Sequence, residues 1–197
     1  SDFIANVTHE LLTPLTLILG PLSRVLGDPT LSEAARRSLE SARRNGHRLH
    51  NLVNDVLDFS KAQADLLVVH KEALELVGLL RNLVLDVQPQ AELAQLTLSV
   101  ESELERLDVL LDPKLLERML LNLIGNAVKF TPAGGRVRVA VAVSAGKLRI
   151  AVQDTGIGIP QSALPSLFQK FSRVDNSTTR RQEGTGLGFA LVQLFAQ

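Results

Sequence analysis

The feature that most constrains this fold is a pair of long helical patterns at the start of the chain. Between residues 3 and 27, apolar side chains recur every three or four positions, as on the buried face of a helix. Pro14 lies inside this stretch and predicts a bend, because proline removes a backbone hydrogen bond and crowds the preceding turn. The segment 27–30, Gly-Asp-Pro-Thr, ends the helix. A second helix, capped by Thr30 or Ser32, is then predicted to run to about Ala64.

Two helices joined by a tight turn form a hairpin. The second stripe of small and apolar residues runs from Leu39 to Phe59 and lies among arginines and asparagines. One hairpin cannot bury both stripes well, whereas two copies can do so in a four-helix bundle. We therefore expect a homodimer formed through the hairpin.

After Ala64 the pattern changes to short strands that alternate with helices. The predicted strands are 67–70, 97–100, 109–111, 136–144 and 147–153, and the predicted helices are 74–87, 113–129 and 186–197. The last two strands flank a tight Ala145-Gly146 turn, as in an antiparallel hairpin. The sequence thus predicts an α+β chain with a helical hairpin, residues 1–64, and an α/β domain, residues 65–197. The last helix carries apolar residues that nothing downstream covers, so we expect this domain to be truncated at its C-terminus.

Charge and composition exclude several classes of protein. Twenty-one basic residues balance 21 acidic ones, which argues against a general nucleic-acid binder. The chain has no cysteine and therefore neither disulfides nor thiolate metal sites. No apolar run approaches the ~18 residues that span a bilayer. We expect no membrane contact by this fragment and a cytoplasmic location, with any anchor, such as that of an inner-membrane sensor, elsewhere in the parent protein.

The first group of residues with chemical potential is on the first helix. His9, Glu10 and Thr13 lie on or beside one helical face. A neutral imidazole is a competent nucleophile near pH 7, and an adjacent carboxylate can orient it or accept its other proton. The alternative for a His-Glu pair alone is a solvated surface histidine.

The second group follows one face of the helix predicted at 113–129. Asn122, Asn126 and Lys129 are spaced to share that face. Amide oxygens are suitable ligands for a hard cation such as Mg²⁺, and lysine can bind phosphate. The alternative is a solvated polar face, which is disfavoured because the rest of the helix is so apolar.

Two glycine-rich segments complete the set. Residues 154–158, Asp-Thr-Gly-Ile-Gly, follow a strand, so the carboxylate could bind an exocyclic amine while glycine permits close approach to a planar ligand. Residues 184–188, Gly-Thr-Gly-Leu-Gly, open a helix, whose first N–H groups favour anions. Asp-Thr-Gly alone is more typical of a strand-ending turn, and Gly-x-Gly-x-Gly alone is common. The second motif is not a Walker A loop because it lacks the Gly-Lys-Ser/Thr ending.

Taken in order, these motifs resemble those of the sensor histidine kinase family of two-component systems. The segment 3–15 is similar to its H-box, 122–132 to its N-box, and 154–158 and 184–188 to its two glycine boxes. Residues 167–175, Leu-Phe-Gln-Lys-Phe-Ser-Arg-Val-Asp, resemble the F-box that starts the family's ATP lid. The resemblance spans essentially the whole chain.

The resemblance implies a mechanism and a set of site residues. His9 would accept a phosphoryl group from ATP and pass it to an aspartate of a response-regulator receiver domain. Glu10 would be its acid–base partner, and Thr13 would align a water in any phosphatase activity toward the regulator. The second domain would be an ATP-binding α/β sandwich of the gyrase, chaperone and histidine kinase (Bergerat) type.

In that domain, Asn126 would hold Mg²⁺ against the phosphates with Asn122 in support. Lys129 would contact phosphate, and Asp154 would bind the adenine amine. The further binding residues that the resemblance implies are Gly156, Gly158, Phe168, Phe171, Arg173, Gly184, Thr185, Gly186, Leu187 and Gly188.

Departures from the family leave alternatives open. Leu12 replaces a usual basic residue, and the strands that normally follow the last helix are missing, so a degenerate, non-catalytic dimeric scaffold remains an alternative. Phe189 replaces a usual aliphatic residue, a change that packing can absorb. A gyrase-type or chaperone-type ATPase would carry glutamate in place of Asn122, since an amide cannot act as a base toward water. His47 and His50 could share a metal but are more typical of solvated surface residues.

Overall fold

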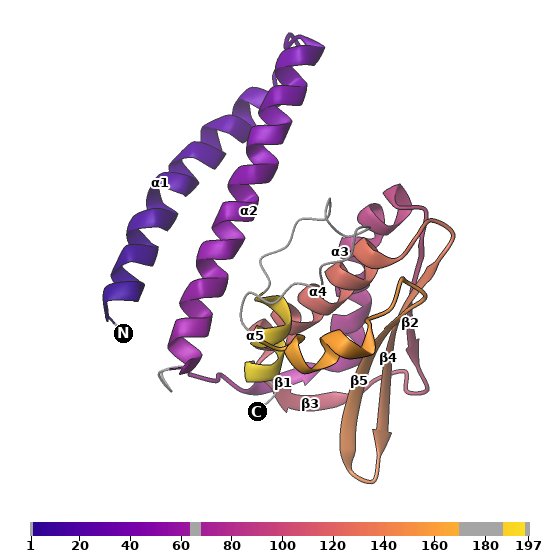
Figure 1. Ribbon diagram of the computed structural model, residues 1–197. Coiled ribbons are helices and arrows are strands. Elements are labelled where there is room, and N and C mark those ends of the chain that lie inside the picture. Colours follow the sequence, from indigo (N-terminus) through magenta and orange to yellow (C-terminus); the bar gives the residue numbers. More distant parts are fainter. Residues whose placement is uncertain (1, 64–67, 170–186, 196–197) are drawn as a thin grey trace. The chain divides into compact units, whose positions relative to one another are not determined.

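The computed structural model describes residues 2–63, 68–169 and 187–195 (Figure 1). It divides into two compact units, residues 1–67 and 68–197. The first is helical and the second combines a sheet with helices, so the predicted α+β class is confirmed. Each unit is described by itself below.

The first unit is the predicted helical hairpin. Helix α1 is Asp2–Leu26 and α2 is Glu33–Gln63. Ser32 is the cap of α2, since its Oγ accepts a hydrogen bond from Ala35 N at 3.2 Å. Pro14 and Pro21 both lie within α1.

The turn of the hairpin is fixed by polar contacts to its backbone. Asp28 Oδ1 accepts hydrogen bonds from the backbone N and the hydroxyl of Thr30, at 2.8 and 2.7 Å. The guanidinium of Arg36 donates to the carbonyls of Leu26 and Asp28, each at 2.9 Å. The Arg36 side chain of α2 thereby binds the end of α1 and the turn that follows it.

The two helices pack along one apolar seam. Its buried members are Leu15, Leu19, Leu26, Val53 and Leu57. A β-carbon on Gly46 would come 2.6 Å from Leu19 Cδ2, so α2 approaches α1 closely at this level.

The second unit contains two small sheets. Strands β1, Glu72–Glu75, and β3, Asp108–Leu111, form an antiparallel pair, which we call the β1–β3 ribbon. Strands β2, Thr97–Ser102, β4, Arg136–Ser144, and β5, Lys147–Asp154, form a sheet in the order β2-β4-β5. β2 is parallel to β4, and β4 and β5 are antiparallel around the Ala145-Gly146 turn, whose φ angles are 51° and 73°.

Helices cover one face of this sheet. Helix α3 is Leu76–Leu93, α4 is Pro113–Phe130 and α5 is Gly188–Phe195; a 3-10 helix, η1, covers Gln161–Ser166. α3 packs on β2, α4 packs on β4 and β5, and α5 packs on α4 (Figure 1). The core between them is almost wholly aliphatic and includes Leu76, Leu80, Ile124, Val137 and Val139.

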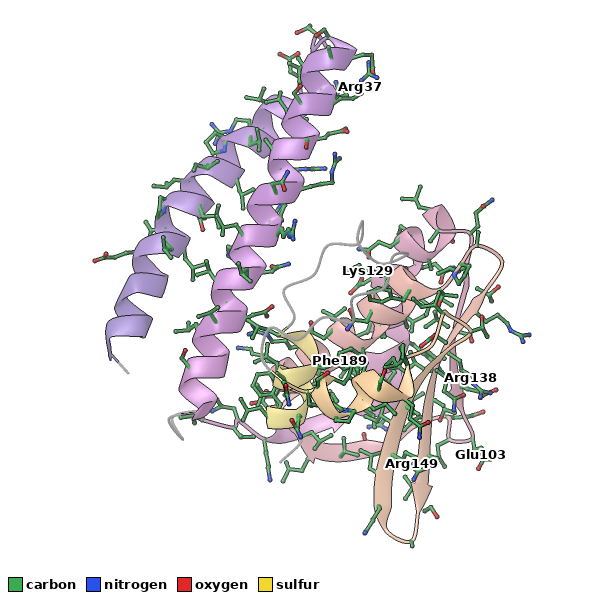
Figure 2. The ribbon with its side chains drawn as sticks, viewed as in Figure 1. Arg37, Glu103, Lys129, Arg138, Arg149 and Phe189 are labelled. Carbon is green, nitrogen blue, oxygen red and sulfur yellow. The ribbon has the colours of Figure 1, made fainter. Side chains whose placement is uncertain are left out.

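The opposite face of the sheet is exposed and basic. It carries Arg136, Arg138, Lys147 and Arg149, of which Figure 2 labels Arg138 and Arg149. Arg138 forms an ion pair with Glu101 on β2 at 2.6 Å.

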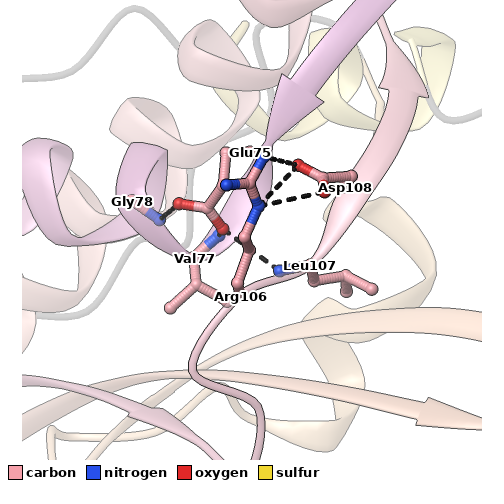
Figure 3. A network of polar contacts seen from close by, with 6 residues as sticks. All are labelled: Glu75, Val77, Gly78, Arg106, Leu107 and Asp108. Atoms are coloured by element: carbon pink, nitrogen blue, oxygen red, sulfur yellow. Dashed lines mark hydrogen bonds and ion pairs between the residues drawn. The ribbon is translucent and has the colours of Figure 1, made fainter.

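The strand predicted at 67–70 is wrong, and the bounds of the next helix differ from the prediction. Residues 68–71 are not in a strand, and β1 instead begins at Glu72, where the chain pairs with β3. The helix predicted at 74–87 is α3, which begins at Leu76 because the Glu75 carboxylate caps it, accepting from Val77 N and Gly78 N (Figure 3). α3 also continues through Pro89, which lies on the exposed side, so water can bind the freed Leu85 carbonyl.

Candidate functional site

Helix α4 brings together the three polar residues that the sequence singled out. Asp112 caps it, with Oδ1 accepting from Leu115 N at 3.1 Å, and Pro113 occupies its first turn. One face is buried in the core through Leu116, Leu120, Ile124 and Ala127. Asn122, Asn126 and Lys129 follow the other side of the helix and are half-buried.

The start of α5 lies against this polar face. A β-carbon on Gly188 would come 3.1 Å from Asn122 Oδ1 and 3.4 Å from its Cγ. Leu187 and Leu191 are buried, and Leu191 N donates to Leu187 O at 2.9 Å. The last glycine of the 184–188 motif thus meets the asparagine that begins the polar face of α4.

The loop after β5 is joined to the end of the same helix. Asp154 Oδ1 accepts a hydrogen bond from Gly156 N at 2.8 Å, and Ile157 N donates to the carbonyl of Phe130 at 3.2 Å. A β-carbon on Gly156 would come 2.6 Å from that carbonyl oxygen, and Gly158 has φ +68°. Only glycine fits both positions without strain. The loop therefore lies beside the C-terminal end of α4, and the motif at 154–158 is a neighbour of the polar residues on that helix.

Threonines that the sequence analysis did not single out hold this corner. Thr155 Oγ1 accepts from Arg136 N at 2.9 Å, and Thr155 N donates to Arg136 O at 3.0 Å. The buried Thr131 donates to Ala127 O at 2.6 Å. A β-carbon on Gly135 would clash with the side chains of both threonines. The Thr-Pro-Ala-Gly-Gly run at 131–135 was the available signal, because its glycines permit this close approach.

Lys129 lies at the C-terminal end of α4. Its Nζ is 4.8 Å from the centroid of the Phe130 ring, an arrangement that favours a cation over the ring face. Figure 2 labels its side chain. The lysine thus places positive charge at the end of the polar face, near the loop that begins at Asp154.

An aromatic pair joins the residues that follow η1 to α5. The rings of Phe168 and Phe189 meet edge to face, with centroids 6.1 Å apart and planes at 83°. Phe189 therefore has a packing partner at the position where the family usually carries an aliphatic residue. Of the other predicted binding residues, Phe171, Arg173, Gly184, Thr185 and Gly186 lie outside the described residues.

The predicted nucleophile lies on α1. The backbone of His9 is helical, and its side chain is outside the described part of the structure. Glu10 and Thr13 are exposed one residue and one turn further along. The Thr16 hydroxyl donates a hydrogen bond to the carbonyl of Leu12 at 2.9 Å.

Within the described ranges, no group of three or more His, Cys, Asp or Glu residues could hold a metal ion. His47 is exposed, and His50 Nδ1 lies 3.1 Å from the Asn54 side-chain amide. A metal at α4 would therefore take neutral amide oxygens from the protein. That donor set suits Mg²⁺, which is often bound by one or two protein ligands and otherwise by phosphates and water.

Comparison with known proteins assigns both units to the same family. Residues 1–65 match the His Kinase A (phospho-acceptor) domain, and residues 111–197 match the histidine kinase-, DNA gyrase B- and HSP90-like ATPase family. The chain belongs to the sensor histidine kinases. Its α/β unit is therefore the ATPase-type domain of such a kinase, and its hairpin is the phospho-acceptor domain.

The relatives that match this kinase core are longer chains. It is 38% identical over 196 residues to the circadian input-output histidine kinase CikA of Synechococcus elongatus, covering 98% of this chain and 26% of that protein. It is 38% identical over 200 residues to the signal transduction histidine-protein kinase BarA of Escherichia coli, covering 98% and 22%. The chain thus spans about a quarter of the length of these relatives.

Solved structures agree on the fold. Full-length ShkA in complex with AMPPNP has a TM-score of 0.80 and 32% identity, covering 99% of this chain and 40% of that one. Histidine kinase ThkA in complex with response regulator protein TrrA has a TM-score of 0.58 at 24% identity, covering 88% and 51%, and supports the fold alone. No helix among the described residues of the kinase core is long and apolar enough to cross a membrane.

Proposed function

We propose that this kinase core transfers the γ-phosphoryl group of ATP to His9 and then passes it to an aspartate of a response-regulator receiver domain. The observation that carries this proposal is the polar face of α4. Asn122 lies on it where a water-activating ATPase would need a carboxylate, Asn126 lies one turn further along, and Gly188 lies against Asn122. An ATP site built to position phosphates, without a base for water, suits transfer to another nucleophile.

Four groups around α4 would share the recognition of ATP. Asp154 has one carboxylate oxygen committed to Gly156 N, and its second oxygen would accept a hydrogen bond from the adenine amine. Gly156 and Gly158 would allow the base to approach the backbone. Lys129 would contact phosphate. Phe168, Leu187 and Gly188 would border the site.

Mg²⁺ would be held by Asn126, with Asn122 in support. When bound, the ion would neutralise charge on the phosphates and align them. The protein's own residues supply the rest: α4 fixes the two amides one turn apart, and the core face of α4 keeps that helix immobile against the sheet.

At the acceptor, a neutral His9 imidazole would attack the γ-phosphorus. A nitrogen–phosphorus bond forms, the bond to the β,γ-bridging oxygen breaks, and ADP leaves with the bond's electron pair. Glu10 would orient the imidazole and accept its other proton. The phosphoryl group would then pass to a carboxylate oxygen of the receiver aspartate: an oxygen–phosphorus bond forms, the nitrogen–phosphorus bond breaks, and Glu10 returns the proton, so that His9 is a neutral imidazole again.

A homodimer through the hairpin is the second part of the proposal. Leu11, Ile18 and Val25 recur at seven-residue spacing on α1 and are exposed, although Leu15 and Leu19 beside them are buried. A second stripe at this spacing favours packing on another helix pair. A hairpin of residues 1–64 would thus form the dimeric bundle, and residues 65–197 would form the catalytic domain.

Thr13 gives the hairpin a further potential activity. It lies one helical turn after His9 on α1 and is exposed. At this position its hydroxyl would align a water for hydrolysis of the phosphorylated regulator.

The test measures nucleotide binding and phosphorylation separately. The purified chain is titrated with a fluorescent ATP analogue, then incubated with Mg²⁺ and ATP, and the modified residue is mapped by mass spectrometry. We expect saturable binding and an acid-labile phosphate on His9. Binding without phosphorylation would indicate a non-catalytic scaffold, and no binding would refute an ATP site on α4.

A further inference from the structure

Two carboxylates connect the ends of the β1–β3 ribbon to the two helices that follow its strands. Asp112 follows β3, and its Oδ1 accepts from Leu115 N in the first turn of α4. Its other oxygen, Oδ2, accepts from His70 N at 2.8 Å, two residues before β1 begins. One carboxylate therefore binds both the start of α4 and the segment that leads into β1.

Glu75 does the same at the opposite end of the ribbon. Its Oε1 accepts from Val77 N at 3.0 Å and from Leu107 N at 3.1 Å, and its Oε2 accepts from Gly78 N at 2.7 Å (Figure 3). Glu75 thus joins the first turn of α3 to the segment that leads into β3. Arg106 pairs with Asp108 beside it at 3.0 Å.

The register places these two connections at opposite ends of a short, rigid element. Glu72 pairs with Leu111 next to Asp112, and Glu75 pairs with Asp108 next to Leu107. Each strand of the ribbon is consequently fixed where it begins and where it ends.

We propose that Asp112 is a positioning residue that couples the segment entering the second unit to the nucleotide-binding face of α4. This inference rests on the proposed ATP site at Asn122 and Asn126. The second unit begins at Val68, so His70 lies within three residues of that boundary. Displacement of this segment is transmitted through the carboxylate to the first turn of the helix that carries both asparagines.

The charge state of Asp112 supports this role. Burial alone would raise its pKa, but hydrogen bonds from the backbone N–H groups of His70, Leu115 and Lys114 outweigh burial and hold the pKa below its usual value. The side chain is therefore ionised at neutral pH, and both of its oxygens are acceptors.

One substitution separates the two contacts of Asp112. Asparagine is as good a helix cap as aspartate, so Asp112→Asn keeps the bond to Leu115 N. Its amide nitrogen then faces His70 N and cannot accept a hydrogen bond from it. Asp108→Asn is the matched control, because Asp108 lies on the same ribbon and its side chain forms an exposed ion pair with Arg106.

The experiment is hydrogen–deuterium exchange of the full chain with and without a non-hydrolysable ATP analogue. In the wild type and in Asp108→Asn, we expect the analogue to slow exchange in α4 and also, by about fivefold or more, in residues 70–75. In Asp112→Asn, exchange should still slow in α4 but not in residues 70–75. Asp112→Ser, which also keeps a cap, repeats the test if the asparagine variant does not fold.

Each other outcome overturns a defined claim. If the analogue slows exchange in α4 but not in residues 70–75 of the wild type, the coupling does not exist. If Asp112→Asn loses the effect in α4 as well, Asp112 acts by folding the helix and is not a positioning residue. If Asp112→Asn behaves like the wild type, the bond to His70 carries no coupling. An analogue that slows exchange nowhere refutes the proposed ATP site itself.

Discussion

Gly188, at the start of α5, faces Asn122 of α4 so closely that a β-carbon on the glycine would come 3.1 Å from the asparagine Oδ1. These two residues lie 66 positions apart in the sequence, and their contact brings two motifs together at the polar face of α4. The close approach of Asn122, and not the backbone conformation, favours glycine here, since its φ is not in the left-handed region.

We predict that Gly188→Ala weakens binding of an ATP analogue, because the added methyl group displaces Asn122 or the start of α5. Overpacking of this kind costs about 1–3 kcal/mol, which corresponds to roughly fivefold or more in the dissociation constant. Gly125→Ala is the control on α4, since a β-carbon there meets nothing within 4 Å. It should leave binding unchanged and stabilise the helix by about 0.5–1 kcal/mol. Equal binding by the two variants would contradict the proposed site.

Substitution of Asp154 separates its structural contact from its proposed contact with adenine. Asp154→Asn retains an oxygen for Gly156 N, so the loop should keep its conformation. The loss of a charged acceptor should weaken ATP binding by about 1.5–3 kcal/mol, or tenfold or more. Calorimetric titration with ATP measures the affinity, and the melting temperature shows whether the loop keeps its conformation. Wild-type affinity in the asparagine variant would show that Asp154 does not bind the base.

The exposed stripe on α1 predicts a concentration-dependent dimer. Ile18→Asp places a charge where an apolar partner is expected, and burial of an isoleucine side chain contributes about 1.5–3 kcal/mol in each subunit. Sedimentation analysis should therefore show a monomer for this variant at concentrations where the wild type is dimeric. Ser23→Asp, at an exposed polar position of α1, should remain dimeric. A dimeric Ile18→Asp variant would place the interface elsewhere.

The second unit should lose stability in acid through Glu75. The hydrogen bond from Leu107 N, with those from Gly78 N and Val77 N, lowers the pKa of this carboxyl below its ordinary value of 4.5. A carboxyl whose pKa is lower in the folded state stabilises the fold above its unfolded pKa, and this stabilisation is lost as pH falls through the folded pKa. The free energy of unfolding in urea should therefore fall below about pH 4.5 for the wild type, and it should fall less for Glu75→Gln over that range. An identical pH dependence in both proteins would contradict the role of this carboxylate.

The parts of this fold that were predictable are those that local sequence determines. The hairpin follows from apolar periodicity and the Gly27–Thr30 break, and α4 follows from its cap at Asp112 and its buried face. The antiparallel pair β4–β5 follows from alternation and a two-residue turn. In each of these elements, neighbouring residues carry the signal.

The parts that were missed depend on residues distant in sequence. β1 begins at Glu72 because it pairs with β3, and Glu75 ends the strand because Leu107 N and the first turn of α3 share its carboxylate. The corner formed by Thr131, Gly135 and Thr155 likewise exists only once β5 returns beside α4. No local pattern encodes such contacts.

The most direct test of the account is the transfer of γ-labelled phosphate from ATP to the wild type, His9→Gln and His47→Gln. Because His9 is the proposed nucleophile and His47 an exposed histidine on α2, label should appear in the wild type and in His47→Gln but be absent from His9→Gln. All three should bind ATP equally, since the nucleotide site lies in the other unit. Equal labelling of His9→Gln and the wild type would contradict the central claim.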